Sequence, residues 1–89
     1  MLDSKTIRGV VLAVIKAYRN IDEVEFSETL ALLQHAPSDE VRMEAATITE
    51  IWNTTKDLDP TTHPRLTRNR LRLIDDGVQR LEVLTRLKD

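Results

Sequence analysis

The sequence contains no cysteine, and this absence excludes several kinds of site at once. Without cysteine the chain has no disulfide framework, no thiolate ligand for a metal ion and no cysteine nucleophile. A domain of 89 residues buries only roughly 60–65% of the surface that its unfolded chain exposes. We therefore expect its stability to depend on closely packed helices or on a partner subunit.

Glycine, proline and aromatic residues are also scarce. There are two glycines, three prolines and three aromatic residues, while leucine, alanine, glutamate and arginine are common. Few chain breakers and few aromatic side chains favour helices over strands. No phosphate-binding glycine loop, nucleophile elbow or HExxH motif occurs. The composition therefore predicts an all-α protein and lends no support to an enzyme.

Long hydrophobic runs are missing as well. No apolar run approaches the roughly 20 residues that a membrane-spanning helix needs. The apolar stretch at residues 10–15 follows Asp3 and has no small-residue cleavage site behind it, so it does not resemble a signal peptide. We expect a cytoplasmic protein without a membrane partner.

Charge is distributed unevenly along the chain, although the net charge is only −2. Residues 1–19 and 60–89 each carry a net charge of +3, and residues 20–59 carry −8. An acidic middle region therefore separates two basic ends. Such a region can simply promote solubility. Alternatively, it mimics nucleic acid or attracts a basic partner, and its charge then chiefly speeds association.

Apolar residues recur at spacings of three and four along most of the chain, which predicts four helices. The expected helices span residues 4–19, 23–35, 38–55 and 65–87. We expect residues 1–89 to form a single helical domain, since no internal repeat or low-complexity tract divides the chain. A small antiparallel bundle or an orthogonal array of these helices is the simplest way to bury their apolar faces.

Residues that favour helix starts precede these patterns. Asp3 or Ser4 is the expected N-cap of the first helix, and Ser38 that of the third. Asp22 is the expected start of the second helix, because a glutamate three residues later completes a capping box. Ser27 is an alternative start for that helix.

The fourth helix carries an apolar sector wider than a surface helix needs. One seam consists of Leu71, Ile74, Val78 and Leu81. A second seam, about one residue's rotation away, consists of Leu66, Leu73, Gly77, Leu84 and Leu87. Either this helix is central in its own bundle, or a second copy or another partner covers the second seam. Gly77 suits both arrangements, because glycine lets two backbones come close, as we also expect of Gly9.

The start of the fourth helix is basic. The chain has no acidic residue between Pro60 and Ile74. The basic cluster in this segment consists of Arg65, Arg68, Arg70 and Arg72. Three of its members recur at the spacing i, i+3, i+7, which suits contacts with successive phosphates. Three roles are open to the cluster: to neutralise the protein's own acidic helices, to bind nucleic acid, or to bind an acidic protein. No aromatic residue is interleaved with the arginines to stack on bases, which weakens the nucleic-acid interpretation.

Histidines and paired carboxylates are the remaining candidates for chemistry. His35 and His63 each stand near an expected helix boundary, and neither has acidic residues at a metal-ligand spacing. Acid pairs such as Asp75 and Asp76 fall on the expected helix surfaces rather than in a pocket. We therefore expect no catalytic residue, no metal site and no cofactor.

Together these features favour a non-enzymatic protein that acts through protein–protein contact, as an inhibitor or regulator. We expect it to form a homodimer through its C-terminal helix, with the second seam as the interface. The alternative is a small nucleic-acid-binding regulator that uses the four arginines of the basic cluster.

Overall fold

Four helices account for most of the chain. The computed structural model describes residues 3–87, except for the side chains of Ser4 and Leu87. Its helices are α1 (Ser4–Arg19), α2 (Glu23–Leu33), α3 (Asp39–Thr55) and α4 (Pro64–Leu87). The prediction of an all-α fold is confirmed, and each helix begins and ends within two residues of its predicted position.

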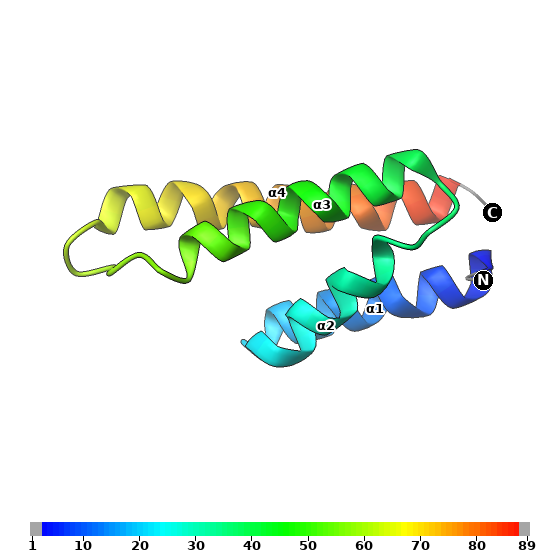
Figure 1. Ribbon diagram of the computed structural model, residues 1–89, viewed down its shortest axis with the longest axis horizontal. Helices are drawn as coiled ribbons and strands as arrows, with labels where there is room; N and C mark the ends of the chain where they lie inside the picture. The colour runs from blue at the N-terminus through cyan, green and yellow to red at the C-terminus, as the bar shows by residue number, and fades with distance from the viewer. Residues whose placement is uncertain (1–2, 88–89) are drawn as a thin grey trace.

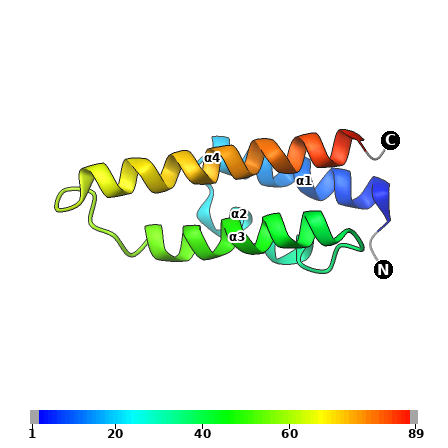
Figure 2. The ribbon, with the colours of Figure 1, turned by 90° about the horizontal axis from the view of Figure 1, so that it is seen from above.

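The helices form two antiparallel hairpins, α1–α2 and α3–α4, which pack on each other (Figure 1). Each helix contacts the next one along the chain, and α4 returns to contact α1. In the view from above, α1 lies behind α4 and α2 lies behind α3 (Figure 2). Of the two architectures expected from the sequence, the protein therefore adopts the antiparallel bundle. The α3–α4 hairpin extends past the α1–α2 hairpin at the end that carries the loop of residues 56–63 (Figure 1).

A single core lies between the two hairpins and draws side chains from all four helices. Its largest fully buried members are Phe26, Leu30, Leu33, Ile48, Ile74, Leu81, Val11, Val14 and Val41. Complete burial of such a side chain contributes about 1.5–3 kcal/mol relative to exposure. Of the first seam of α4, Ile74, Val78 and Leu81 are buried, whereas Leu71 at its start is 40% exposed.

Two aspartates cap the helices of the first hairpin. Asp3 Oδ1 accepts a hydrogen bond from the Thr6 N–H at 2.7 Å, and Asp22 Oδ1 accepts one from the Glu25 N–H at 3.1 Å. The Asp22 cap places the start of α2 at Glu23, so the alternative start at Ser27 is wrong. Each cap satisfies an N–H group that has no partner within the first turn of the helix.

Helix α2 ends at Leu33, two residues before its predicted end. The next three N–H groups, those of Gln34, His35 and Ala36, donate to carbonyls three residues earlier instead of four. Pro37 explains this tightening, because a proline disfavours the α conformation in the residue that precedes it.

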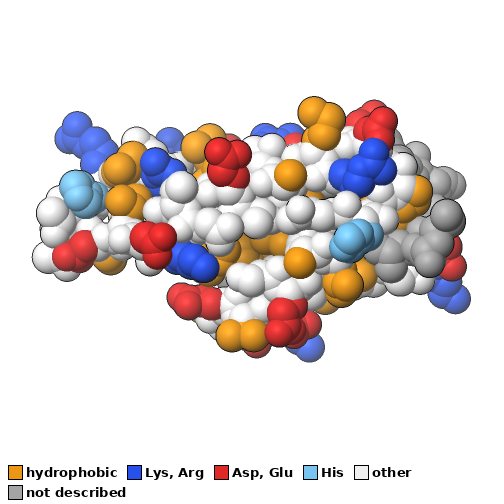
Figure 3. All heavy atoms as spheres, in the orientation of Figure 1, with side chains coloured by type: hydrophobic (Ala, Val, Ile, Leu, Met, Phe, Trp, Pro, Cys, Tyr) orange, Lys and Arg blue, Asp and Glu red, His pale blue; other side chains and the backbone are white. Residues whose placement is uncertain are grey.

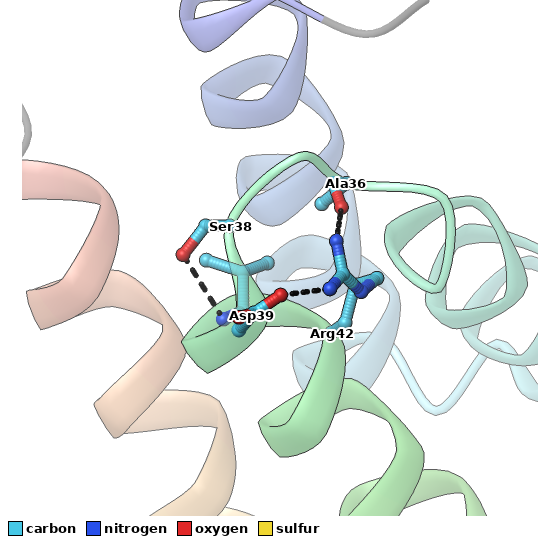
Figure 4. A network of polar contacts seen from close by, with 5 residues as sticks. Ala36, Ser38, Asp39 and Arg42 are labelled. Carbon is cyan, nitrogen blue, oxygen red and sulfur yellow. Dashed lines mark hydrogen bonds and ion pairs between the residues drawn. The ribbon is translucent and has the colours of Figure 1, made fainter.

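The turn between α2 and α3 is held by side chains from the start of α3 (Figure 4). Ser38 Oγ accepts a hydrogen bond from the Val41 N–H at 3.4 Å, as predicted for the N-cap. The Arg42 guanidinium donates to the Ala36 carbonyl oxygen at 2.8 Å and also pairs with the Asp39 carboxylate. Because Ala36 is almost fully buried, this hydrogen bond satisfies a carbonyl that solvent reaches poorly.

Asp59 organises the loop of residues 56–63. Its carboxylate accepts hydrogen bonds from the Thr61 N–H and from the Thr62 hydroxyl, both at 2.9 Å. Its carbonyl oxygen also accepts from the His63 N–H at 2.8 Å, next to Pro64 at the first position of α4. The loop is therefore an aspartate-centred turn that leads directly into a helix start favourable for proline.

Candidate interaction surfaces

Gly77, a member of the second seam, lies inside the bundle. A Cβ atom built on Gly77 would lie 2.6 Å from Ile48 Cγ1 and 3.2 Å from Glu44 Oε1. The close approach at this glycine is therefore between α4 and α3 of the same chain. Gly9 behaves differently, because a Cβ built there has no atom of the described residues within 4 Å beyond its own helix turn. The expectation that Gly9 admits a neighbouring helix is wrong, since Gly9 faces outward on α1.

Three leucines of the second seam lie at the edge of the bundle. Leu66 is 41% exposed and Leu73 is 50% exposed. They stand seven residues apart on one side of α4. Leu84 is half-buried against the core, and the side chain of Leu87 lies outside the described residues.

Two further exposed side chains lie on the same hairpin, past the polar residues Asp76, Gln79 and Arg80 of α4. Met43 of α3 is 70% exposed and Val83 of α4 is 51% exposed, and both line a groove between the two helices. We call the surface formed by Met43, Leu66, Leu73, Val83 and Leu84 the outer face. Figure 3 shows apolar side chains interspersed with charged ones over the α3–α4 hairpin. An ion pair between Arg80 Nε and Glu44 Oε1, at 2.9 Å, joins the two helices beside the outer face.

The arginines at the start of α4 separate into two groups. Ion pairs among the described residues are Arg42–Asp39, Arg80–Glu44 and Arg86–Glu82. Within that part of the chain, Arg65, Arg68 and Arg72 are exposed and take part in no ion pair. Arg70 instead turns toward α3, where it donates to the Thr54 hydroxyl, and its Nε is buried without a hydrogen-bond partner. Three of the four arginines thus form a solvent-exposed basic strip.

An apolar groove lies where α1 ends and α2 begins, and it was not identified from the sequence. The groove has a volume of about 440 Å³ and is lined by Ala17, Tyr18, Arg19, Ile21, Asp22, Glu23, Phe26, Trp52 and Leu71. We call it the aromatic groove, because it contains all three aromatic residues of the chain. The Phe26 ring lies 5.6 Å from that of Tyr18 and 5.1 Å, edge to face, from that of Trp52. Such edge-to-face contacts add to the stabilisation that burial provides.

Hydrogen bonds hold the polar ends of two of these rings. The Tyr18 hydroxyl donates to the Leu71 carbonyl oxygen at 3.4 Å, and Trp52 Nε1 donates to Ser27 Oγ at 3.2 Å. Burial raises the pKa of the Tyr18 phenol above its ordinary value, and the negative charge of Asp75 raises it further. Tyr18 therefore remains a neutral hydrogen-bond donor at the groove wall.

Ile21, at the rim of the aromatic groove, has an unusual backbone conformation. Its φ angle is 55°, the only positive φ among the residues that the structure describes. The Asp22 N–H donates to the Ala17 carbonyl oxygen at 2.9 Å. The Ile21 N–H donates to the Tyr18 carbonyl oxygen at 3.3 Å. These bonds form a Schellman motif, in which glycine usually occupies the left-handed position. An isoleucine just after a helix end was the sequence signal that could have drawn attention to this site.

The described histidines and acidic residues do not come together as metal ligands. His35 and His63 are both exposed and lie at different helix boundaries. Throughout residues 3–87, no three histidine, aspartate or glutamate side chains are grouped so that they could hold a metal ion. None of the helices in that range is long and apolar enough to cross a membrane.

No protein-family model, curated protein or solved structure matches this chain. Its function is therefore inferred from its own surfaces.

Proposed function

We propose that the protein is a non-enzymatic binding protein of the inhibitor or regulator type that forms a homodimer through its outer face. The observation that carries this proposal is the exposure of four large apolar side chains on one side of the α3–α4 hairpin. Met43, Leu66, Leu73 and Val83 remain 41–70% exposed while the opposite side of the hairpin packs on α1 and α2. Apolar side chains gathered on one face of a small protein mark a contact surface.

The side of the hairpin that carries the outer face is comparable in size with a standard dimer interface. The 24 residues of α4 extend for about 36 Å at about 1.5 Å per residue, and the protein is 18–20 Å across. The outline of this whole side is therefore roughly 700 Å² per copy, and a standard interface buries roughly 800 Å² per partner.

Charge along the hairpin favours an antiparallel arrangement of the two copies. The basic strip lies at the start of α4, whereas Glu40 and Asp76, which take part in none of the ion pairs between described residues, line the groove toward the other end of α4. A two-fold axis across the outer face would bring the basic end of one copy near the acidic end of the other. The pairing would then be self-complementary in both shape and charge, with charge chiefly speeding association.

The dimer can be tested by sedimentation equilibrium across the micromolar concentration range. The natural protein should approach twice its monomer mass as concentration rises. Leu73→Glu should remain a monomer, because it places a charge in the centre of the interface. Leu12→Glu makes the same change at a side chain of α1 that is 58% exposed, and it should dimerise normally. A natural protein that stays monomeric throughout this range would refute the proposal.

Nucleic-acid binding is the second candidate, and the exposed basic strip is the observation that favours it. Three phosphate contacts predict a salt slope of about −2.7, so affinity should fall about 40-fold between about 50 mM and about 200 mM salt. A gel-shift titration at these two concentrations measures this slope. Alanine at Arg65, Arg68 and Arg72 together should abolish binding, and binding that survives this change would exclude the strip.

A further inference from the structure

We propose that the aromatic groove is a docking site for a basic segment of a partner protein, which inserts an apolar side chain beside Ile21. This site is separate from the outer face. Leu71 lines the groove and Leu73 lies on the outer face, and positions two residues apart on a helix point about 200° away from each other. A partner can therefore occupy the groove whether or not the protein dimerises.

The conformation of Ile21 is the first observation behind this proposal. A left-handed conformation brings the Cβ of an L-residue close to the next carbonyl oxygen, and a β-branched residue adopts it rarely. Burial does not compensate for this strain, because Ile21 is 82% exposed, more than any other large apolar residue described. The hydrogen bonds that close α1 require a left-handed residue at this position, but they do not require an isoleucine. Residues held in strained conformations gather at functional sites. A contact with another molecule explains why an apolar side chain occupies this position.

The groove beside Ile21 is built to receive an apolar side chain. Phe26 and Ala17, both almost fully buried, form its base, and the half-buried Tyr18 and Trp52 contribute to its walls. Its volume of about 440 Å³ falls within the range of pockets that bind small molecules or anchoring side chains. Aromatic rings held by hydrogen bonds provide a rigid contact surface that loses little entropy when a partner binds.

Charge around the groove identifies the chemistry of the partner. The chain has no lysine or arginine between Arg19 and Arg42. The acidic residues in that interval are Asp22, Glu23, Glu25 and Glu28 at and within the start of α2, and Asp39 and Glu40 at the start of α3, away from the groove. Asp22 and Glu23 line the aromatic groove, where Arg19 is the one basic residue. Glu23 and Glu28 also line a shallow groove that adjoins it at Trp52, where Lys56 is the one basic residue. Lysines or arginines that flank the inserted side chain would meet these carboxylates.

The same charges argue against a second copy of this chain at the groove. A two-fold axis beside Ile21 would bring Asp22 and Glu23 of one copy against the same residues of the other. Like charges that face each other across an interface disfavour that pairing. We therefore assign the groove to a basic partner segment.

Trp52 provides a direct readout, because it is the only tryptophan and it lines the groove. Two short model peptides without tryptophan are titrated, with the same amphipathic leucine pattern and either lysine or glutamate at every polar position. The lysine peptide should change the Trp52 emission saturably, and the glutamate peptide should not. Ile21→Gly and Glu23→Gln should each weaken binding of the lysine peptide by about tenfold, as the loss of an interface hot spot does.

Matched variants away from the groove control for general effects of charge and apolar surface. Glu50→Gln removes an exposed carboxylate of α3 that does not line the groove. Leu12→Ala removes an exposed apolar side chain of α1 that does not line it either. Both should bind the lysine peptide as the natural protein does.

Four results would overturn the proposal. The first is lysine-peptide binding weaker than about 1 mM. The second is equal binding of the lysine and glutamate peptides. The third is unchanged binding in both Ile21→Gly and Glu23→Gln. The fourth is a Trp52 emission that changes with protein concentration without peptide and no longer does so in Ile21→Gly, since a second copy would then occupy the groove.

Discussion

A Cβ atom on Gly77 would lie 2.6 Å from Cγ1 of Ile48, so α4 and α3 meet at a point where no larger side chain fits. Ile48 is fully buried and cannot turn into solvent. This contact holds α4 close to α3 along its middle turns. It also divides the second seam of α4, because Gly77 is enclosed by the bundle while Leu66 and Leu73 remain at the surface.

Replacing Gly77 and Gly9 by alanine should change the free energy of unfolding in opposite directions. Gly77→Ala should lower the free energy of unfolding by about 1–3 kcal/mol, because its Cβ forces Ile48 to move in a packed core. Gly9→Ala should raise it by about 0.5–1 kcal/mol, since alanine favours the helix and has free space there. Urea unfolding at one protein concentration measures both changes.

A double variant tests whether the clash with Ile48 is the cause of the destabilisation in Gly77→Ala. Ile48→Ala removes the atom that the new Cβ would meet. Gly77→Ala combined with Ile48→Ala should therefore be less destabilised than the sum of the two single variants. Strict additivity would show that the contact between these residues is not the reason for the effect.

Replacing two neighbouring residues of α4 by alanine should cause very different losses of unfolding free energy. Ile74→Ala should destabilise the protein by about 2–5 kcal/mol, because Ile74 is fully buried and the change leaves a cavity. Leu73→Ala, at a half-exposed side chain, should change the unfolding free energy of the monomer by less than about 0.5 kcal/mol. Thermal unfolding below the concentration at which dimers form measures this difference. Similar losses for both would mean that the core side of α4 is assigned wrongly.

Ile21→Gly should stabilise the folded protein, although glycine generally destabilises. The left-handed conformation costs isoleucine about 1–2 kcal/mol, and the greater freedom of glycine in the unfolded chain offsets about half of that gain. We expect an increase of about 0.5–1 kcal/mol in the free energy of unfolding, measured by urea denaturation. Ile21→Asn should behave similarly, because asparagine tolerates this conformation. Loss of stability in both variants would contradict the presence of strain at this position.

Asp3 and Asp59 should make the protein less stable in acid. The hydrogen bond from the Thr6 N–H holds the pKa of Asp3 below its ordinary value, and the Thr61 N–H and the Thr62 hydroxyl do the same for the pKa of Asp59. Each lowered pKa means that the unfolded chain binds a proton more readily than the folded protein. The stability that these groups contribute is present above about pH 4 and is lost as pH falls through their folded pKa values.

Carbon NMR of the side-chain carboxyls measures these two pKa values directly. Asp3→Asn and Asp59→Asn retain an oxygen acceptor but no longer titrate, so each variant should lose less stability between neutral and acidic pH than the natural protein. A carboxyl pKa at or above the ordinary aspartate value in the folded protein would contradict the expectation.

The sequence by itself determined the helices and how they begin. Asp22 and Ser38 were identified as caps, and Asp3 was one of two candidates with Ser4, because a helix start depends on hydrogen bonds within one turn of the chain. The breaks between helices were also local, and only the end of α2 differed by more than one residue, where Pro37 tightens the last turn. The first seam of α4 was recognisable because buried residues follow the helical period.

Only the tertiary structure decided which apolar residues are enclosed and which meet solvent. The second seam satisfies the helical period as well as the first, but α3 covers Gly77 and leaves Leu73 half-exposed. The aromatic groove brings Ile21 beside Trp52, 31 positions apart in sequence, and the backbone of Ile21 is set by hydrogen bonds that close the end of α1. Periodicity assigns a side chain to a face of its own helix, whereas its burial depends on the helices that pack against that face.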